Sequence, residues 1–345
     1  MLIDLYSDTA TKPTPAMRRA IAEAEVGDEQ KGEDPTVNRL QAMVAELLGK
    51  EAALFLPSGT MCNEIAVKVH TRPGDAILVD RQAHVLLAEA GGPALLSGVL
   101  VETLDGDRGR FAAEQVAAAV RPGSHYAAPT RLLCVEQTHN FGGGTIWPLA
   151  QLRAVCDVAH EHGLATHLDG ARLMNAVVAS GVPAREYAAS FDSAWLDLSK
   201  GLGAPVGGVL AGSTDFIREA RRYKHIFGGA MRQAGIIAAA GVHALEGHVE
   251  RLAEDHANAR LLAAGLGAIP GVRVENPVPE TNIVFFDIAG TGVAPVDFLA
   301  RIHAEGVRMG AVGPRRLRAV THLDITRANV GRAVTVAGAV LADAA

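Results

Sequence analysis

Short strand-like runs alternate with helical patterns over the first two-thirds of this chain. The alternation predicts an α/β fold whose large, mostly parallel sheet is covered by helices on both faces. The strands are expected at residues 53–56, 76–79, 99–103, 132–136, 165–168, 194–198 and 208–211. The helices are expected at 15–24, 37–48, 63–70, 112–120 and 149–162, where apolar side chains recur at helical spacing.

The pattern changes after about residue 235. An alanine-rich helical segment, 235–264, is expected to cross into a smaller α+β domain. Two strands and two further helices are predicted there, at 272–274, 282–286, 296–305 and 330–342. The predicted organisation is therefore a large domain, 1–240, and a small C-terminal domain, 241–345.

The bulk composition favours a soluble enzyme. Of 345 residues, 49% are hydrophobic and 20% are charged, and the net charge of −6 argues against nucleic acid or an anionic membrane as the main partner. The sequence starts without a signal-peptide pattern and has no run of about 20 apolar residues. Three widely spaced cysteines fit reduced thiols. We therefore expect a cytoplasmic protein.

One lysine stands between a buried strand pattern and a glycine-rich turn. Lys200 follows the apolar run 193–198 and lies in the segment Ser-Lys-Gly-Leu-Gly-Ala-Pro-Val-Gly, 199–207. A lysine at the end of a buried strand is costly unless its charge is removed or used. One use is a Schiff base, in which a desolvated amine attacks a carbonyl. The alternative is a surface lysine on a tight turn.

A candidate phosphate site follows the first predicted strand. The turn Ser58-Gly59-Thr60 precedes a predicted helix, so hydroxyl groups, backbone N–H groups and the positive end of the helix dipole face one point. Taken alone, an ordinary helix N-cap is the better explanation of this turn.

An acid ends another predicted strand. Asp169 lies at the sheet edge where open α/β folds bind ligands. A carboxylate there could keep a pyridinium nitrogen protonated, and the protonated ring accepts electrons from a carbanion. The alternative is a structural ion pair with Arg172. A lysine, a carboxylate and a phosphate cradle at strand ends are the three groups that pyridoxal phosphate needs.

The histidines suit ring stacking or proton transfer better than metal binding. The imidazole of His84 could stack on a cofactor ring or act as a base, and a packed or surface histidine is the alternative. His160 and His162 are two apart on a predicted helix, so they point in different directions. No metal site is predicted.

Nine ordered motifs cover nearly the whole chain: 4–11, 32–38, 57–61, 89–92, 138–140, 169–172, 199–207, 228–235 and 320–324. Together they resemble the L-threonine aldolases of the low-specificity type, which are pyridoxal-phosphate enzymes of fold type I, the aspartate aminotransferase fold. The chain differs from many relatives at Gln30-Lys31, Cys62 and Glu64, near the cofactor or the side-chain pocket.

The resemblance implies a role for each candidate residue. Lys200 would bind the cofactor, Asp169 would pair with its pyridine nitrogen and His84 would stack on its ring. The phosphate would be held by Ser58, Gly59, Thr60 and Arg232, with Arg232 reaching from a neighbouring subunit. The substrate carboxylate would be held by Ser7, Arg172 and Arg318, and Arg172 would also contact the cofactor. Either His84 or His125 would take the β-hydroxyl proton.

The implied reaction is retro-aldol cleavage of L-threonine, L-allo-threonine and related L-β-hydroxy-α-amino acids to glycine and an aldehyde. The alternatives are a lyase of the same fold that prefers another substrate, such as phenylserine, a β-eliminating lyase, and a non-catalytic binding protein. The resemblance also implies a role in threonine catabolism and glycine biosynthesis. It implies a homo-oligomer, commonly a tetramer, with sites shared between two chains.

Overall fold

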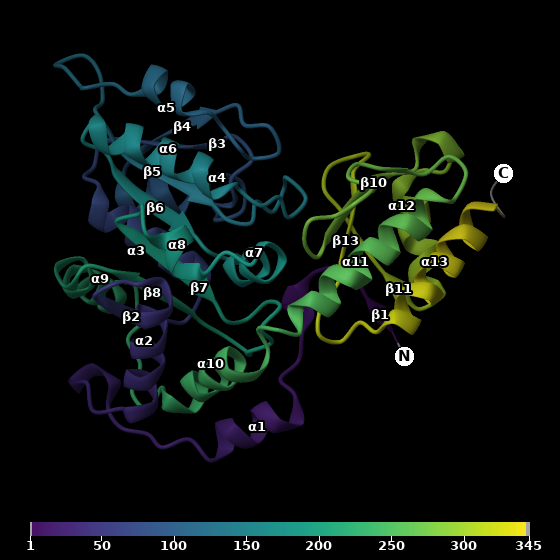
Figure 1. Ribbon diagram of the computed structural model, residues 1–345, viewed down its shortest axis with the longest axis horizontal. Helices are drawn as coiled ribbons and strands as arrows, with labels where there is room; N and C mark the ends of the chain where they lie inside the picture. Colours follow the sequence, from purple (N-terminus) through teal and green to yellow (C-terminus); the bar gives the residue numbers. More distant parts are fainter. Residues whose placement is uncertain (1, 343–345) are drawn as a thin grey trace.

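The computed structural model describes residues 2–342, and its largest sheet has seven strands in the order β2-β8-β7-β6-β5-β3-β4 (Figure 1). These are β2 (Ala52–Leu56), β3 (Ala76–Asp80), β4 (Leu100–Leu104), β5 (Thr130–Glu136), β6 (Ala165–Asp169), β7 (Ser193–Asp197) and β8 (Gly208–Gly212). β8 is antiparallel to both neighbours and the other pairs are parallel. The predicted mostly parallel sheet is confirmed.

Helices cover both faces of this sheet because its strands are apolar on both sides. Leu54 and Leu56 of β2 pack in one cluster with α3 and α9, whereas Phe55 packs in a larger cluster on the opposite face. This two-sided burial explains the continuous apolar runs in the sequence. The helices of this domain are α1 (Pro15–Ala22), α2 (Pro35–Leu48), α3 (Gly59–His70), α4 (His84–Leu87), α5 (Ala113–Ala119), α6 (Leu149–Glu161), α7 (Leu173–Ser180), α8 (Ala184–Ala188), α9 (Thr214–Ile226) and α10 (Gly235–Gly247).

A smaller α+β unit follows, as predicted. Its antiparallel sheet has the order β12-β13-β10-β9 and lies to the right in Figure 1. The elements are β9 (Arg273–Val274), β10 (Ile283–Asp287), β12 (Gly310–Ala311), β13 (Leu317–Val320), α11 (Leu252–Gly267), α12 (Pro295–Ala304) and α13 (Arg327–Ala342).

The N-terminal strand belongs with this smaller unit. β1 (Ile3–Asp4) pairs in parallel with β11 (Val307–Arg308), and Ile3 and Leu5 lie in the apolar cluster of the small sheet. The division into 1–240 and 241–345 stays a prediction, and Met1 and residues 343–345 of those ranges lie outside the described residues. The alternation signal missed β1 because it is two residues long.

The single helix predicted at 235–264 is wrong. The chain forms α10 and α11, with a turn at residues 248–251 between them. Gly247 ends α10, and His248 Nδ1 lies 2.8 Å from the Leu202 carbonyl oxygen. This long-range hydrogen bond ties the turn to the loop after β7, and residues so far apart in sequence carry no local signal of it.

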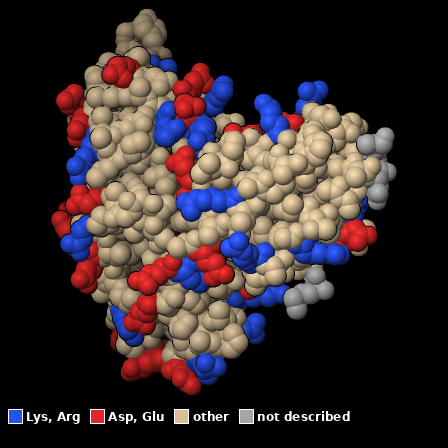
Figure 2. Space-filling model, turned by 45° about the vertical axis from the view of Figure 1, so that its right-hand side comes forward, with Lys and Arg blue, Asp and Glu red and all other residues tan. Residues whose placement is uncertain are grey.

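Figure 2 shows acidic and basic side chains interspersed over the visible face, with no continuous basic band there. Within residues 2–342, the helices are too short or too polar to cross a bilayer.

Candidate active site

The carboxyl ends of the parallel strands meet at one edge of the large sheet, where most predicted site residues lie. β6 ends in Asp169, β7 is followed by Lys200, and β3 is followed by His84. β2 runs in the direction of β7, because β8 between them is antiparallel to both. Ser58, just after β2, therefore lies at the same edge.

Lys200 is largely withdrawn from solvent. Its side chain is 16% exposed and its Nζ lies 2.9 Å from Asp197 Oδ2. The Nζ also lies 5.8 Å from the centre of the Trp195 ring, and the Lys200 carbonyl accepts a hydrogen bond from Thr11 Oγ1 at 3.0 Å. A lysine on an ordinary surface turn would be solvated, so these contacts favour the Schiff-base interpretation.

The turn before α3 keeps its backbone donors accessible. Ser58 caps the helix, since its Oγ accepts from the Met61 N–H at 3.2 Å. The N–H groups of Gly59 and Thr60 lie in the first turn, where intrahelical partners do not exist. A Cβ on Gly59 would lie 2.2 Å from the Trp195 ring. That ring also neighbours Lys200, so the predicted cradle and lysine lie close together.

Gly59→Ala is expected to lower the free energy of unfolding by about 1–3 kcal/mol, because the added methyl group would overpack against Trp195. The affinity for pyridoxal phosphate should fall as well, since the cradle would have to shift. Urea unfolding and cofactor titration measure the two effects. Gly247→Ala is the control: a Cβ there meets nothing within 4 Å. A Gly59 variant as stable as the Gly247 variant would contradict this prediction.

Asp169 is buried and held at both oxygens. Its Oδ2 accepts from Asn63 Nδ2 at 2.8 Å, and its Oδ1 accepts from the Ala171 N–H at 3.0 Å. The alternative ion pair with Arg172 does not form; Arg172 pairs with Asp8 instead. Among the described residues, Asp169 thus retains a buried carboxylate without a bonded cation.

The neighbouring acids Glu136 and Glu89 make a cation beside Asp169 favourable. Burial and the nearby Glu136 and Glu89 raise the pKa of Asp169 to about 6. His84 Nδ1 lies 2.8 Å from Glu89 Oε1, and the backbone N–H of His84 donates to Glu136 Oε2 at 2.9 Å. Burial alone would lower the pKa of His84, but its hydrogen bond to Glu89 and the surrounding carboxylates raise it. A pyridinium placed against Asp169 would lower the pKa of that acid again.

Glu64 is a second buried acid close to this site. Neither of its carboxyl oxygens has a hydrogen-bond partner among the described residues, and only 3% of the residue is exposed. Burial and the neighbouring Glu89 raise the pKa of Glu64 to about 8. Glu64 is therefore largely protonated at neutral pH.

Glu64→Gln is expected to stabilise the protein by about 1–2 kcal/mol at about pH 9, and by much less at about pH 5. The pKa of Glu64 rises from an ordinary value of 4.5 to about 8 on folding, so the folded state binds the proton more tightly. The stability that Glu64 contributes therefore falls as the pH rises from 4.5 to about 8. Glutamine does not ionise, so the substitution removes that loss.

Urea unfolding at the two pH values measures this difference. Glu46→Gln, an exposed position on α2, is the control and should show no pH-dependent gain. An equal gain for Glu64→Gln at both pH values would mean that Glu64 is already ionised at the lower one.

Two arginines converge on Asn140. Arg172 donates through Nε and Nη2 to Asp8 at 2.6 and 2.7 Å, and through Nη1 to Asn140 Oδ1 at 3.3 Å. Arg318 Nη1 donates to the same oxygen at 3.2 Å, while its buried Nε has no partner in the part of the chain that the structure describes. Burial and the nearby Arg172 lower the pKa of Arg318. The unpaired donor fits an incoming carboxylate, and buried Ser7 directly precedes Asp8.

Two predicted residues do not join this cluster. His125 is exposed on the loop before β5. The cluster lies at the other end of that seven-residue strand, about 20 Å away. Arg232 is 63% exposed, and its Nη1 lies 3.2 Å from Asp28 Oδ2. The roles given to His125 and Arg232 stay predictions, and the resemblance implies that Arg232 serves the site of a neighbouring chain.

Four residues of the cluster have no role in the sequence analysis: Asn63, Glu89, Glu136 and Asn140. Glu136 and Asn140 could have been found, because they follow a predicted strand at the correct edge. Asn63 has a weaker signal, since it is a polar side chain that is buried, together with Glu64, in a helix whose other buried residues are apolar.

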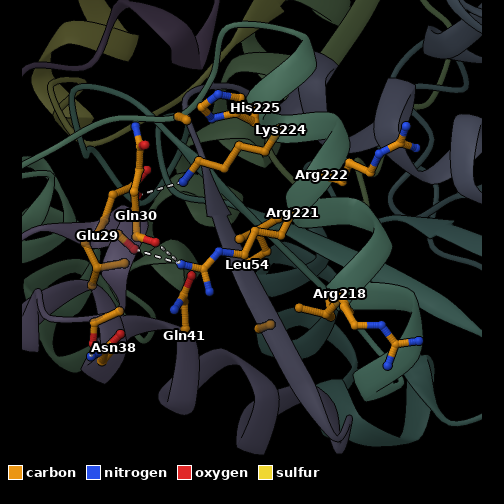
Figure 3. A pocket seen from close by; sticks show the side chains of 15 residues that line it. Glu29, Gln30, Asn38, Gln41, Leu54, Arg218, Arg221, Arg222, Lys224 and His225 are labelled. Atoms are coloured by element: carbon orange, nitrogen blue, oxygen red, sulfur yellow. Dashed lines mark hydrogen bonds and ion pairs between the residues drawn. The ribbon is translucent and has the colours of Figure 1, made fainter.

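A cleft of about 340 Å³ lies beside α9, separate from the cluster of site residues at the sheet edge (Figure 3). Arg221 and Lys224 point toward it, but both cations already have partners. Lys224 Nζ lies 2.7 Å from Glu29 Oε2, and Arg221 Nη2 donates to the Gln30 carbonyl at 2.7 Å. Its lining contains no residue of the cluster described above.

Sequence comparisons agree with the geometry. Residues 4–290 match the family described as β-eliminating lyase. The low-specificity L-threonine aldolase 1 of Arabidopsis thaliana is 41% identical over 334 residues, which are 95% of this chain and 93% of that protein. The low specificity L-threonine aldolase of Escherichia coli K12 is 42% identical over 327 residues, 94% of this chain and 95% of the other.

Solved structures show the same fold. A threonine aldolase from Leishmania major has a TM-score of 0.85 at 22% identity, covering 98% of this chain and 99% of its own. A serine palmitoyltransferase from Sphingomonas wittichii has a TM-score of 0.78 at 18% identity, and the match covers 99% of this chain and 88% of that protein. The expected fold type I architecture is confirmed. The chain belongs to the β-eliminating lyase family and, within it, to the low-specificity L-threonine aldolases.

Proposed function

We propose that this protein cleaves L-threonine, L-allo-threonine and related L-β-hydroxy-α-amino acids to glycine and an aldehyde, with pyridoxal 5′-phosphate as cofactor. One observation carries the proposal: Lys200 and the buried Asp169 lie at one edge of the large sheet, and Arg318 of the small sheet, whose Nε has no partner among the described residues, reaches Asn140 there. Two relatives that are 41% and 42% identical are named low-specificity L-threonine aldolases.

The cofactor site is assigned to three groups. Lys200 Nζ would bind the cofactor aldehyde, and the turn at Ser58, Gly59 and Thr60 would hold its phosphate. Asp169 would hold a proton on the ring nitrogen. When bound, the cofactor supplies the electron sink that allows the Cα–Cβ bond to break. Solved serine palmitoyltransferases of the same fold contain this cofactor.

The substrate carboxylate is assigned to the two arginines. Arg172 Nη1 and Arg318 Nη1 both donate to Asn140 Oδ1, and Ser7 would complete the site. Asp8 holds the other two nitrogens of Arg172 at 2.6 and 2.7 Å, so the guanidinium keeps one orientation. A fixed carboxylate in turn fixes the Cα–Cβ bond, and such orientation accounts for much of the rate in reactions of this kind.

The β-hydroxyl proton is assigned to His84. Because Glu89 occupies Nδ1 at 2.8 Å, Nε2 remains to accept the proton. The Cα–Cβ bond then breaks, the β-carbon leaves as the aldehyde, and Cα takes a proton to give glycine. His125 could contribute from a neighbouring chain. Shared sites would require at least a homodimer, and we propose a tetramer of two such dimers.

An assay of the products tests the proposal. Purified holoenzyme is supplied with L-threonine, L-allo-threonine and L-phenylserine, and aldehyde, ketoacid and ammonia are measured. Aldehyde and glycine in equal amounts are expected. Ketoacid and ammonia without aldehyde would instead identify a β-eliminating lyase, and faster turnover of phenylserine would identify the other alternative. We also propose a role in threonine catabolism and glycine supply, and a cytoplasmic location, which fractionation of cells tests.

A further inference from the structure

A buried chain of hydrogen bonds lies behind Asp169, and the reaction described above does not use it. Asn63 Nδ2 lies 2.8 Å from Asp169 Oδ2 and 2.7 Å from Glu89 Oε1. Asn63 Oδ1 accepts from the Trp195 indole nitrogen at 2.7 Å. Only 1% of Asn63 is exposed. The helix that begins at the phosphate cradle thus also carries the residue that holds Asp169.

The orientation of the Asn63 amide follows from its partners. An indole nitrogen only donates, and an ionised carboxylate only accepts. The amide oxygen must therefore face Trp195, and the two amide hydrogens must face Asp169 and Glu89. A flipped amide would set its oxygen against two carboxylates and its hydrogens against a donor.

The hydrogen bonds continue through three more residues. His167 Nε2 lies 3.2 Å from Asn63 Oδ1, and His167 Nδ1 lies 2.8 Å from Ser193 Oγ. His70 Nε2 lies 2.8 Å from the same hydroxyl oxygen. Burial lowers the pKa of His167 to about 3 and that of His70 to about 4, so both rings are neutral near pH 7.

Neutral rings and an acceptor at one end give the chain a single direction. The oxygen of Asn63 only accepts, so His167 carries its hydrogen on Nε2. His167 Nδ1 then accepts from the Ser193 hydroxyl, and Ser193 accepts from His70 Nε2. Every bond dipole points toward Asp169. Aligned hydrogen bonds polarise one another in a low-dielectric interior.

We propose that Asn63 is a positioning residue that keeps Asp169 oriented and ionised, and that the aligned chain behind it holds its amide in the required direction. The inference rests on the role proposed for Asp169. By giving one hydrogen to Asp169 and one to Glu89, Asn63 separates two buried acids. Without it the two acids would face each other with no donor between them, and the nearby Glu89 already raises the pKa of Asp169.

The test compares Asn63→Ala with Asn258→Ala in enzyme loaded with pyridoxal phosphate. Asn258 is 2% exposed, and its amide donates to the Ile325 carbonyl at 2.9 Å in the small unit. Loss of two hydrogen bonds to charged groups is expected to lower kcat for threonine cleavage about 10- to 100-fold in Asn63→Ala. KM should change less than about threefold, since the arginines are untouched.

A spectroscopic readout separates positioning from general damage. With ¹⁵N-labelled cofactor, the pyridine resonance is expected to move toward the neutral ring in Asn63→Ala and to stay in place in Asn258→Ala. Glu136, His84 and Lys200 also face Asp169 and are the same in both variants. An unchanged resonance with kcat within twofold of the control would overturn the inference.

Asp169→Asn distinguishes this inference from the proposed function. If Asp169→Asn leaves the pyridine resonance unchanged, the role of Asp169 itself is wrong. If Asp169→Asn moves the resonance and Asn63→Ala does not, only the inference about Asn63 fails.

The unaltered holoenzyme provides a test that does not depend on any variant folding. Neutron diffraction after deuterium exchange is expected to place deuterium on Nε2 of His167 and of His70, with the Ser193 hydroxyl directed at His167 Nδ1. Deuterium on His167 Nδ1, or on both nitrogens of that ring, would overturn the proposed direction of the chain.

Discussion

Lys200→Ala is expected to lower aldehyde release from L-threonine by at least about 10⁴-fold, because removal of a nucleophile that acts as part of a unit costs nearly the whole of its catalysis. Its Nζ is the amine withdrawn at the sheet edge, 2.9 Å from Asp197 and close to Asp169. The covalent attachment of the cofactor should disappear with the activity. Absorbance of the bound cofactor and a coupled aldehyde assay measure the two losses.

Lys224 makes this a sharp test, because it is also a buried lysine. Its Nζ lies 2.7 Å from Glu29 Oε2, and both side chains are 4% exposed. Borohydride reduction followed by peptide mapping should therefore find the cofactor on Lys200. Cofactor found on Lys224, or full aldehyde release by Lys200→Ala, would refute the assignment. Lys68→Ala, on α3 away from the strand edge, should retain activity within about twofold.

The large sheet could be predicted because its strands are buried on both faces and separated by helices of ordinary length. The antiparallel direction of β8 could also have been inferred: only residues 198–207 join it to β7, too few for a parallel crossover. The split between α10 and α11 and the pairing of β1 with β11 could not, since each depends on contacts between residues far apart in the chain.

The candidate site divides in the same way. Lys200, Asp169 and Ser58 were predicted because each immediately follows or ends a strand, and strand polarity alone brings them to one edge. Their partners were not predicted, because hydrogen bonds such as Asn63 to Asp169 join residues 106 positions apart. The role given to His125 stays a prediction, since the residue lies on the loop before β5, at the end of the strand opposite to Glu136.

Asp8→Asn is expected to lower the free energy of unfolding by about 3–5 kcal/mol, because it leaves the buried guanidinium of Arg172 without a counter-charge. Asp8 is fully buried and binds Arg172 through two hydrogen bonds of 2.6 and 2.7 Å. Burial alone would raise the pKa of Asp8, but Arg172, with further help from Lys200 and Asn282, lowers it well below its ordinary value of 3.8. Urea unfolding at pH 7 measures the loss.

The control is an ion pair of the same length on the surface. Arg218 Nη1 lies 2.6 Å from Asp215 Oδ1, but the two side chains are 73% and 82% exposed. Asp215→Asn should therefore cost no more than about 0.5 kcal/mol in the free energy of unfolding.

The pH dependence of stability gives a second check on the Asp8–Arg172 pair. Because the pKa of Asp8 is depressed in the folded state, its contribution is present above pH 3.8 and is lost as the pH falls toward the lower value. The difference in stability between the unaltered protein and Asp8→Asn should therefore shrink in acid. A difference that stays constant with pH, or costs that are equal for Asp8 and Asp215, would show that burial does not set the strength of the Asp8–Arg172 pair.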